Sequence, residues 1–557
     1  MPSVDTTAAP RVLRAYLGPY RRSLAALAVA LVAATGLPLA APQLLRRFVD
    51  QATAGEPQRL LTGTALAYLT VAIGGQLVTV IATYGASRIA WGTANQLRED
   101  LVEHVLRLDL AWHGGHTAGE LIERVDGDVT SLAQFISRFL FQMLGSALLL
   151  AGAVVLVFRE DWRVGAVLVA FLVATTLAVV RGQRVAQPLA EVEREAAAQL
   201  VGNVEERLAG AEEIRALAAA DHVLRRFHEA TGAAYRANVR YERVAGGLAA
   251  GTRLAFALGT AAMVGAGIAL MRRGALSVGT VVLLFQYTVM VRRPLENVIQ
   301  QFKEFQVAAA GAARVVQLLH ERPTIVERPA ASVVPLPATG ALGVRFDHVT
   351  FAYAGDPPVL HDVTLDLAPG RSLGLVGRTG SGKSTMARLL LRLYDATHGA
   401  VLVGGVDVRD VAFASLRSRV RLVTQDVQLF GASVRDNLTV FAERVDDRGD
   451  DARMVDVLGE LGLAPWYRSL PDGLDTRIGA GAIGVSAGEA QLLAFARVFL
   501  ADPGLVLLDE ASSRLDPSTE QLIDRAIDKL FRDRTVVVIA HRLSSLERVD
   551  EIAVVDD

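Results

Sequence analysis

Six apolar stretches in the first half of the chain constrain its fold more than any other feature. They lie at residues 23–45, 60–84, 139–158, 163–180, 246–271 and 278–291. Most of them reach the roughly 20 residues that a helix needs to cross a bilayer, and they contain few charged residues. We therefore expect a membrane bundle of six helices rather than the buried helices of a large soluble protein. The 557 residues are 52% hydrophobic and 21% charged, so a more polar part must accompany this bundle.

The connections between these stretches are of two kinds. The second-to-third and fourth-to-fifth connections are long, polar and helix-prone, whereas the others are short. This pattern predicts helices that continue far beyond the membrane on one side. Arginines concentrate in the long connections and before the first stretch, which places that side and the N-terminus in the cytoplasm and the chain in the cytoplasmic membrane. The basic start has no clear cleavage site, so we expect a retained membrane helix rather than a signal peptide.

Two segments in the long connections are candidates for contact with another domain. Residues 119–129 and 208–216 are each predicted to form a short helix at the tip of a helical hairpin. A solvated turn explains either sequence equally well.

Three arginines lie near the cytoplasmic ends of the fifth and sixth stretches, namely Arg253, Arg292 and Arg293. Such residues can meet an anionic substrate or a lipid headgroup. More commonly, a long basic side chain near a membrane end extends to the membrane surface. The sequence alone favours this second role.

The second half contains a glycine-rich loop between a predicted strand and a predicted helix. Residues 372–376 form an apolar run of buried-strand type, and residues 386–393 indicate a helix. The intervening G-x-x-x-x-G-K-S sequence can surround phosphates with backbone N–H groups, a positive helix end and a lysine. A glycine-rich turn without a ligand is the alternative, but its flanking elements favour an ATP site. The candidate ATP-binding residues are Gly377, Arg378, Thr379, Gly380, Ser381, Gly382, Lys383, Ser384 and Thr385.

Polar residues that follow predicted strands complete a candidate catalytic centre. One buried-strand sequence ends in Asp509, which suits Mg²⁺, and Glu510, which suits a general base that polarises water. His541 ends another strand and is a candidate contact to the γ-phosphate, although a lone histidine there is more often structural. Gln425 follows a third strand and is a candidate sensor of Mg²⁺ or water. Glu510, His541 and Gln425 are therefore the candidate catalytic residues, and Ser384, Gln425 and Asp509 the candidate Mg²⁺ ligands, although Gln425 taken alone favours a role without a ligand.

Prolines separate the two halves of the chain. We expect a transmembrane domain at 1–310, a linker at 311–342 and a nucleotide-binding domain at 343–557. The predicted fold class is a membrane α-helical bundle followed by an α/β P-loop ATPase domain. A net charge of −2 provides no basic excess for nucleic acid, and the lack of cysteine excludes disulfides and thiolate metal sites.

Taken together, these features resemble a half-transporter of the ABC exporter family with type IV architecture, over nearly the whole chain. The most specific piece is V-S-A-G-E-A-Q at 485–491, which is similar to the family signature L-S-G-G-Q/E. Tyr353 matches the aromatic residue that stacks on adenine. The Q-loop, D-loop and switch histidine of the family correspond to Gln425, residues 513–516 and His541. The two predicted hairpin tips correspond to the family's coupling helices.

This resemblance implies a function and a second chain. Two ATP molecules would lie between two nucleotide-binding domains, each touching the phosphate loop of one chain and the signature of the other. The signature residues Ser486, Ala487, Gly488 and Glu489 would thus contact the partner's ATP. The implied activity is ATP-driven export or flipping of a hydrophobic or amphipathic small molecule, lipid or peptide by alternating access. A nucleotide-gated regulatory or channel-like membrane protein is the alternative, which Glu510 and His541 disfavour.

The sequence departs from the family pattern in three places. Ala487 replaces the usual glycine, where its methyl group would crowd the γ-phosphate or restrict the backbone. Residues 478–484 lack the usual acidic residue. We therefore expect a heterodimer with a second half-transporter, with a homodimer as the alternative. The third departure is the end at Asp557, where the family commonly continues, so the chain is either trimmed or able to dispense with that tail.

Overall fold

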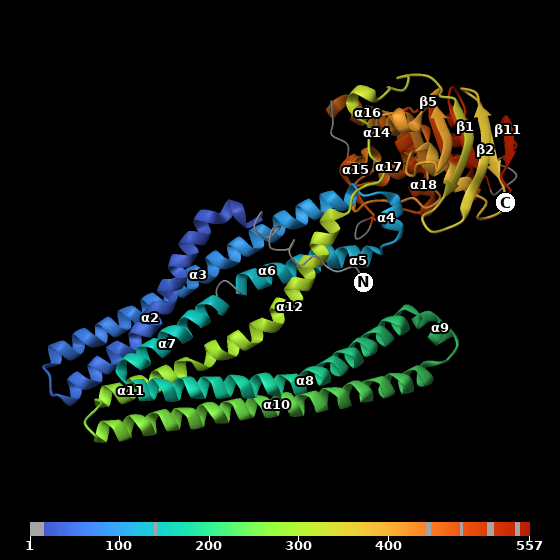
Figure 1. Ribbon diagram of the computed structural model, residues 1–557. Helices are drawn as coiled ribbons and strands as arrows, with labels where there is room; N and C mark the ends of the chain where they lie inside the picture. Colours follow the sequence, from blue (N-terminus) through green and yellow to red (C-terminus); the bar gives the residue numbers. More distant parts are fainter. Residues whose placement is uncertain are drawn as a thin grey trace. The chain divides into compact units, whose positions relative to one another are not determined.

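The computed structural model describes residues 16–138, 142–441, 447–479, 483–509, 517–540 and 546–556. The chain divides into two units (Figure 1). The first comprises Met1–Leu106 and Ala118–Glu321, and the second comprises Arg107–Thr117 and Arg322–Asp557.

The described part of the first unit is built from long helices joined by short ones. Its elements are η1 (Gly18–Tyr20), α2 (Arg21–Thr53), α3 (Gln58–Leu106), α5 (Ala118–Ile122), the π-helix η2 (Glu123–Asp128), α6 (Val129–Arg138), α7 (Leu144–Glu160), α8 (Trp162–Ala209), α9 (Ala211–Ala216), α10 (Ala220–Arg272), α11 (Val278–Met290) and α12 (Arg292–His320). The last helix therefore includes residues 311–320, which we had placed in the linker.

The apolar stretches fall within these helices. Within the described residues, four helical segments are long and apolar enough to cross a membrane, namely Gly18–Thr53, Gln58–Leu106, Trp162–Ala209 and Ala220–Arg272. The described part of the third stretch lies in α7, which has 17 residues, and the sixth lies in α11, which has 13. Only Val291 separates α11 from α12, so the sixth stretch is carried on by a further helix.

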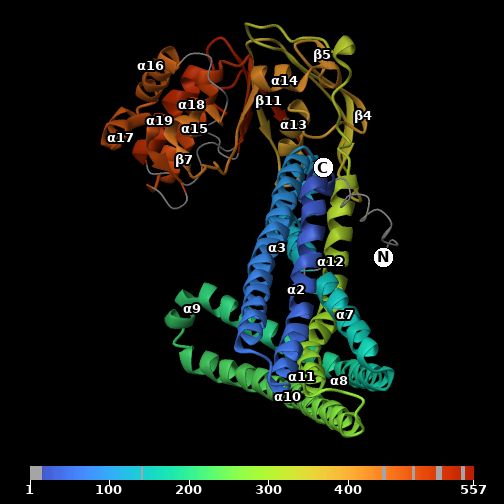
Figure 2. The same cartoon turned by 90° about the vertical axis from the view of Figure 1, so that its left-hand side faces the viewer.

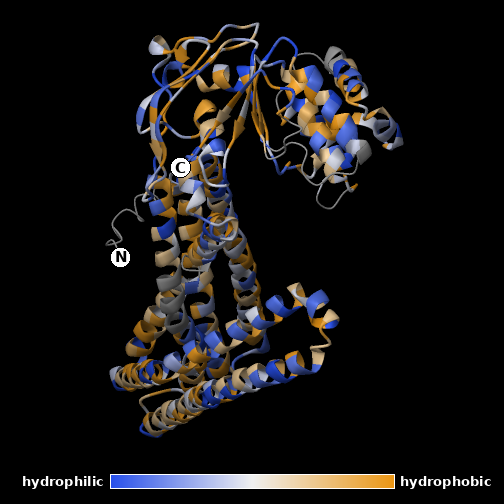
Figure 3. Ribbon diagram, turned by 90° about the vertical axis from the view of Figure 1, so that its right-hand side faces the viewer, coloured by the Kyte–Doolittle hydropathy of each residue, from blue (hydrophilic) through white to orange (hydrophobic). Residues whose placement is uncertain are grey.

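Large apolar side chains point outwards from the long helices. Val29, Ile81 and Leu254 are 71%, 65% and 61% exposed, respectively. Figure 3 shows many apolar residues along these helices, interspersed with hydrophilic ones. So much exposed apolar surface is unfavourable in water, whereas lipid solvates it well. The helices are therefore suited to a bilayer.

Helices α8 and α10 lie side by side and are joined at their far end by α9 (Figures 1 and 2). Close packing depends on a glycine, because a Cβ atom on Gly259 would lie 2.4 Å from the Phe171 ring. Phe171 in turn packs edge-on against Phe256, with ring centroids 5.2 Å apart. The predicted helix at residues 208–216 is thus present as α9 at a hairpin tip.

Polar contacts tie α2 to the rest of the bundle. The buried Tyr287 hydroxyl of α11 donates to the Leu39 carbonyl at 2.8 Å and accepts from Gln43 at 3.3 Å. At the end of α7, Glu160 forms an ion pair with Arg46 at 2.5 Å.

The described part of the second unit contains three sheets. An antiparallel sheet has the order β2 (Pro358–Leu367), β1 (Val344–Ala352), β4 (His398–Val403) and β5 (Val406–Asp407). A parallel sheet has the order β11 (Glu551–Val554), β3 (Ser372–Val376), β10 (Thr535–Ile539), β9 (Leu505–Asp509) and β6 (Val420–Val423). Strands β7 (Ala432–Ser433) and β8 (Arg477–Ile478) form a small ribbon.

Helices and short helical turns connect these strands or flank them along the chain. They are α4 (Leu110–Gly114), η4 (Ala330–Ser332), α13 (Lys383–Leu390), η5 (Val408–Asp410), α14 (Phe413–Arg419), α15 (Val434–Thr439), α16 (Asp447–Glu460), α17 (Ala464–Ser469), η6 (Gly473–Asp475), α18 (Ala487–Ala501) and α19 (Pro517–Leu530). Successive strand residues point to opposite faces, so Leu505 and Leu507 enter one core and Val506 and Leu508 the other. A strand buried on both faces needs such a continuous apolar run.

The segment Arg107–Thr117 belongs to the second unit although its neighbours in sequence belong to the first. Asp109 accepts hydrogen bonds from the hydroxyl and N–H of Thr324, and from the N–H of Ile325 at 3.3 Å. Residues 119–129, for which we had weighed a contact element against a solvated turn, lie in the first unit, and a contact with another domain stays a prediction. Asp109 thus ties Arg107–Thr117 into the second unit, because its hydrogen-bond donors lie 215 and 216 residues further along the chain.

Candidate functional site

The glycine loop joins the end of β3 to the start of α13, as predicted. Gly377 has φ 155°, and a Cβ atom there would lie 2.1 Å from the Val555 carbonyl oxygen. Gly382 precedes α13 with φ 96°, and its Cβ would lie 2.6 Å from a Leu360 methyl group. Both positions therefore require glycine, because the loop is held tightly between its neighbours.

Lys383 holds the loop in its present shape. Its side chain is buried, at 5% exposure, and its Nζ donates to the carbonyls of Gly377 at 2.9 Å and Arg378 at 2.6 Å. An ammonium group is a strongly hydrated point charge, so burial requires such acceptors. Phosphate oxygens are stronger acceptors than these carbonyls, and the same donor can serve them instead.

Ser384 and Asp509 meet at the carboxyl edge of the parallel sheet. The Ser384 hydroxyl donates to Asp509 Oδ2 at 3.3 Å. The two residues come from elements 125 positions apart, and only the order β3–β10–β9 brings them together. A hydroxyl and a carboxylate beside a phosphate cradle are the oxygen ligands that suit Mg²⁺.

Tyr353 lies beside the same loop. Its hydroxyl is 2.9 Å from Thr385 Oγ1 and accepts a hydrogen bond from Arg388 at 3.0 Å. Its ring packs edge-on against Phe351 and Tyr394, with centroids 4.9 and 5.2 Å away. An aromatic face is thus held next to the phosphate cradle. The role of Arg388 in positioning this ring was not predicted, although its place one turn after Thr385 was a signal.

Gln425 lies at the same edge of the sheet as Asp509. Strand β6 is parallel to β9, with Val423 opposite Leu508, and Gln425 follows two residues later as an exposed side chain. Glu510, His541 and residues 513–516 lie outside the described residues. Asp509 directly precedes Glu510, and Ile539 lies two residues before His541. Asp509 and Ile539 are paired across the parallel strands β9 and β10.

The predicted signature forms the start of α18. Ser486 caps the helix by accepting the Glu489 N–H at 3.2 Å, and the Glu489 carboxylate accepts both the N–H and the hydroxyl of Ser486 at 2.8 Å. This reciprocal capping box satisfies backbone donors that a helix start leaves free. Among the described residues, no hydrogen bond or ion pair links positions 486–489 to the loop at 377–385.

Ala487 and Gly488 have different surroundings within this signature. Ala487 is exposed and is the first helical residue, so its backbone needs no glycine. The predicted backbone restriction at Ala487 is therefore wrong, since a methyl group fits a helical position freely. Gly488 is buried, and a Cβ there would lie 2.2 Å from the Thr519 methyl group. Glycine is required at Gly488 by the contact with α19.

Comparison with known proteins agrees with this arrangement. The description "ABC transporter transmembrane region" matches residues 24–295, and "ABC transporter" matches residues 360–513. The chain belongs to the ABC transporter family. It is 32% identical to a fatty acid ABC transporter ATP-binding/permease protein of Mycobacterium tuberculosis, over 83% of this chain and 72% of that protein.

Two further relatives cover almost the whole chain. One is the ATP-dependent lipid A-core flippase of Escherichia coli, which is 27% identical over 97% of this chain and 92% of its own length. The other is the solved structure of a bacterial Atm1-family ABC exporter with ATP bound. It matches with a TM-score of 0.75 and 25% identity, over 96% of this chain and 94% of that chain.

These findings confirm the predicted fold class, in which a transmembrane helical domain precedes a nucleotide-binding domain. They also confirm the predicted activity class, an ATP-hydrolysing transporter of the exporter type. The chain is thus a membrane-spanning ABC exporter that binds ATP.

Proposed function

We propose that the chain is one half of a dimeric exporter that moves an amphipathic molecule out of the cytoplasm with the energy of Mg²⁺-ATP hydrolysis. The observation that carries this proposal is the meeting of Ser384 and Asp509 at the mouth of a glycine cradle. The relatives act on fatty acid or lipid A-core by name, which supports an amphipathic substrate.

Each residue of the site has a definite task in this proposal. Lys383 exchanges its carbonyl partners for the β- and γ-phosphates, and the loop N–H groups bind the same oxygens. Ser384 and Asp509 hold Mg²⁺, with Gln425 nearby at the sheet edge. Bound there, Mg²⁺ would supply positive charge to the phosphate oxygens.

Three further groups complete the proposed site. The Tyr353 ring offers its face to adenine. Glu510 accepts a proton from the attacking water, and His541 contacts the γ-phosphate. Their neighbours Asp509 and Ile539 sit side by side on β9 and β10, which supports a shared location.

The signature is proposed to serve a second chain. Ser486 and Glu489 order the start of α18, and its N–H groups present partial positive charge that suits a phosphate. ATP would bind more tightly to the closed pair of chains than to the open pair. Its binding would therefore favour closure, which would switch the membrane bundle from inward- to outward-facing. The N-terminus and the nucleotide-binding domain would face the cytoplasm.

We propose a heterodimer as the first arrangement and a homodimer as the alternative. The helical backbone of Ala487 removes one objection to self-association, since no strain arises in this chain. The remaining objection is the methyl group itself, which would face the partner's γ-phosphate. Residues 478–484 also still lack the acidic residue usual in the family.

The test is ATP hydrolysis by this chain purified alone in lipid nanodiscs. The heterodimer proposal predicts low activity that rises when a second half-transporter is added. Robust activity of the chain alone that Glu510→Gln abolishes would argue against an obligate heteromer. Absence of ATP hydrolysis in every combination would contradict the proposed pump.

A further inference from the structure

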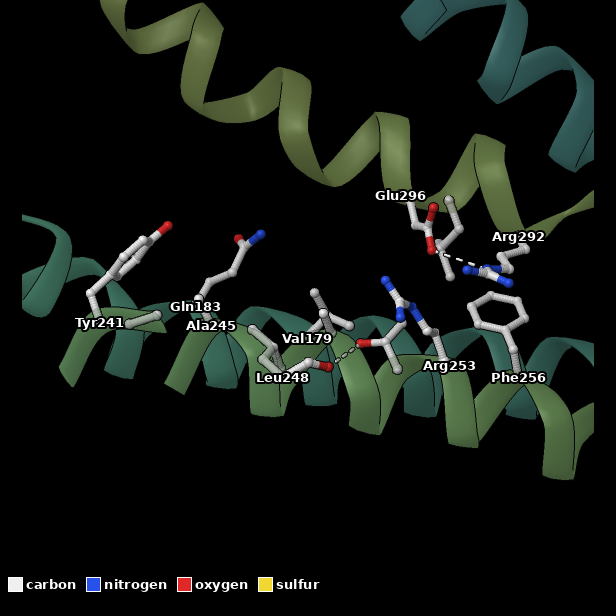
Figure 4. A pocket seen from close by; sticks show the side chains of 13 residues that line it. Val179, Gln183, Tyr241, Ala245, Leu248, Arg253, Phe256, Arg292 and Glu296 are labelled. Carbon is white, nitrogen blue, oxygen red and sulfur yellow. Dashed lines mark hydrogen bonds and ion pairs between the residues drawn. The ribbon is translucent and has the colours of Figure 1, made fainter. Parts of the chain in front are cut away.

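A cavity of about 460 Å³ lies between α8, α10 and α12 of the first unit. Its size falls within the range of small-molecule sites, which is roughly 300–1,000 Å³. Figure 4 shows side chains from all three helices around it. The apolar part of its wall includes Val179, Leu248 and Phe256.

The apolar wall is rigid at one end. Phe256 is only 4% exposed and packs edge-on against Phe171 of α8. Rigid aromatic and aliphatic side chains suit a hydrocarbon chain, because little side-chain freedom is lost when the chain binds.

The charged part of the wall is unbalanced. Arg292 and Glu296, one turn apart on α12, form an ion pair at 3.2 Å and compensate each other. Arg253 projects into the same cavity from α10 (Figure 4). Within the described part of the chain, Arg253 forms no ion pair or side-chain hydrogen bond. Among the described residues, one positive charge therefore faces the cavity without a partner.

Neutral polar groups lie beside this charge. Gln183 of α8 and Tyr241 of α10 line the cavity and point into it (Figure 4). Both side chains can donate hydrogen bonds to an anion. An apolar ligand would leave these donors unsatisfied. The Thr252 hydroxyl is already used, since it donates to the Leu248 carbonyl at 2.8 Å.

An uncompensated arginine within a membrane segment is costly unless it meets an anion or reaches the interface. Arg253 lies seven residues inside the fifth apolar stretch, about 10 Å along a helix from its start. Its side chain turns to a cavity that holds two further hydrogen-bonding groups. These surroundings favour a ligand-binding role for Arg253 over extension of its side chain to the membrane surface, which the sequence alone had favoured.

We propose that this cavity binds an amphiphile with an anionic headgroup, which pairs with Arg253 while its hydrocarbon chain lies along Val179, Leu248 and Phe256. The inference names the substrate class of the proposed exporter, and to that extent rests on the proposed function. A carboxylate and a phosphate satisfy Arg253 by the same chemistry.

The experiment measures binding to the full-length protein in phosphatidylcholine nanodiscs without ATP. Three tritiated probes share one oleoyl chain, namely oleate, oleoyl lysophosphatidic acid and neutral monoolein. We expect at least one anionic probe to bind more tightly than monoolein. Arg253→Ala should raise the Kd of that probe about ten- to hundredfold, as for loss of a charged hydrogen bond, and leave monoolein unchanged.

Two control variants separate this site from general effects. Arg253→Lys keeps the charge but not the guanidinium fork, so the Kd should be intermediate. Arg243→Ala removes an exposed arginine from the same helix outside the cavity, and binding should not change. Preference for oleate or for lysophosphatidic acid would identify the headgroup as carboxylate or phosphate, and either supports the proposal.

The proposal is overturned if monoolein binds as tightly as both anions. It is equally overturned if Arg253→Ala leaves both anions unaffected, or weakens all three probes alike. The proposed function is tested separately by ATP turnover of the same samples. Binding of oleate with no ATP hydrolysis would contradict the pump but not the site, and ATP hydrolysis without anion selectivity would contradict the site alone.

Discussion

Replacement of Gly488 by alanine tests the packing beneath the signature. The added Cβ would lie 2.2 Å from the Thr519 methyl group and 3.1 Å from Thr519 Cβ and Oγ1. Carbon atoms in contact prefer about 3.5–4.0 Å, so α18 and α19 must separate by more than 1 Å or Thr519 must rotate. Threonine is stiff at χ1, which makes rotation costly.

Overpacking of this size costs about 1–3 kcal/mol. For a domain of about 200 residues, each kcal/mol lowers Tm by roughly 2–4 °C. We therefore expect Gly488→Ala to lower the Tm of the nucleotide-binding domain by about 2–12 °C. The assay is thermal unfolding of full-length protein in detergent, followed by tryptophan fluorescence at one fixed heating rate.

Two variants make the result specific. Ala487→Gly changes the neighbouring exposed position, where no clash arises. Its shift in Tm should therefore be smaller than that of Gly488→Ala. Gly488→Ala with Thr519→Ser removes the methyl group that clashes, and should recover most of the lost Tm. An unchanged Tm in Gly488→Ala, or no recovery in the double variant, would refute the packing argument.

Three further predictions concern individual contacts. Arg314 donates hydrogen bonds through two nitrogens to Asp128, which is only 3% exposed. Arg314→Lys should therefore destabilise the first unit by about 1–3 kcal/mol, and a chemical unfolding midpoint equal to that of the wild type would disprove this. The side chain and N–H of Ser372 hold the pKa of Asp550 below its usual range, so its contribution to stability is present above about pH 4 and disappears as the pH falls through the lowered pKa. Asp550→Asn should therefore lower Tm at pH 7, and its difference from wild type should shrink as the pH falls below about 4 through the lowered pKa. A constant difference at all pH values would contradict this. Ser384→Ala should weaken Mg²⁺-dependent ATP binding more than Mg²⁺-free binding, measured by titration with and without EDTA.

The sequence predicted the elements that carry strong local signals. The apolar stretches form helices because they are longer and more apolar than the loops of a folded protein. The glycine loop was recognisable because Gly377 and Gly382 occupy φ values that other residues avoid. The meeting of Ser384 with Asp509 followed from the general rule that parallel strands share a carboxyl edge.

Tertiary contacts between distant segments could not be read in this way. Asp109 docks on Thr324 through a pairing that no local pattern around either residue encodes. The helical state of Ala487 depends on the cap at Ser486, so the single substitution suggested a strain that the fold does not contain. The isolation of Arg253 emerged only when α8, α10 and α12 were placed around one cavity.

Uphill transport tests the central claim most directly. Inside-out vesicles from cells that express the full chain would be given ATP and a panel of fluorescent amphiphiles, with Glu510→Gln as the matched control. We expect wild-type vesicles to accumulate at least one amphiphile against its gradient, and Glu510→Gln vesicles not to do so. Net uphill accumulation that continues in the Glu510→Gln vesicles would contradict the central claim.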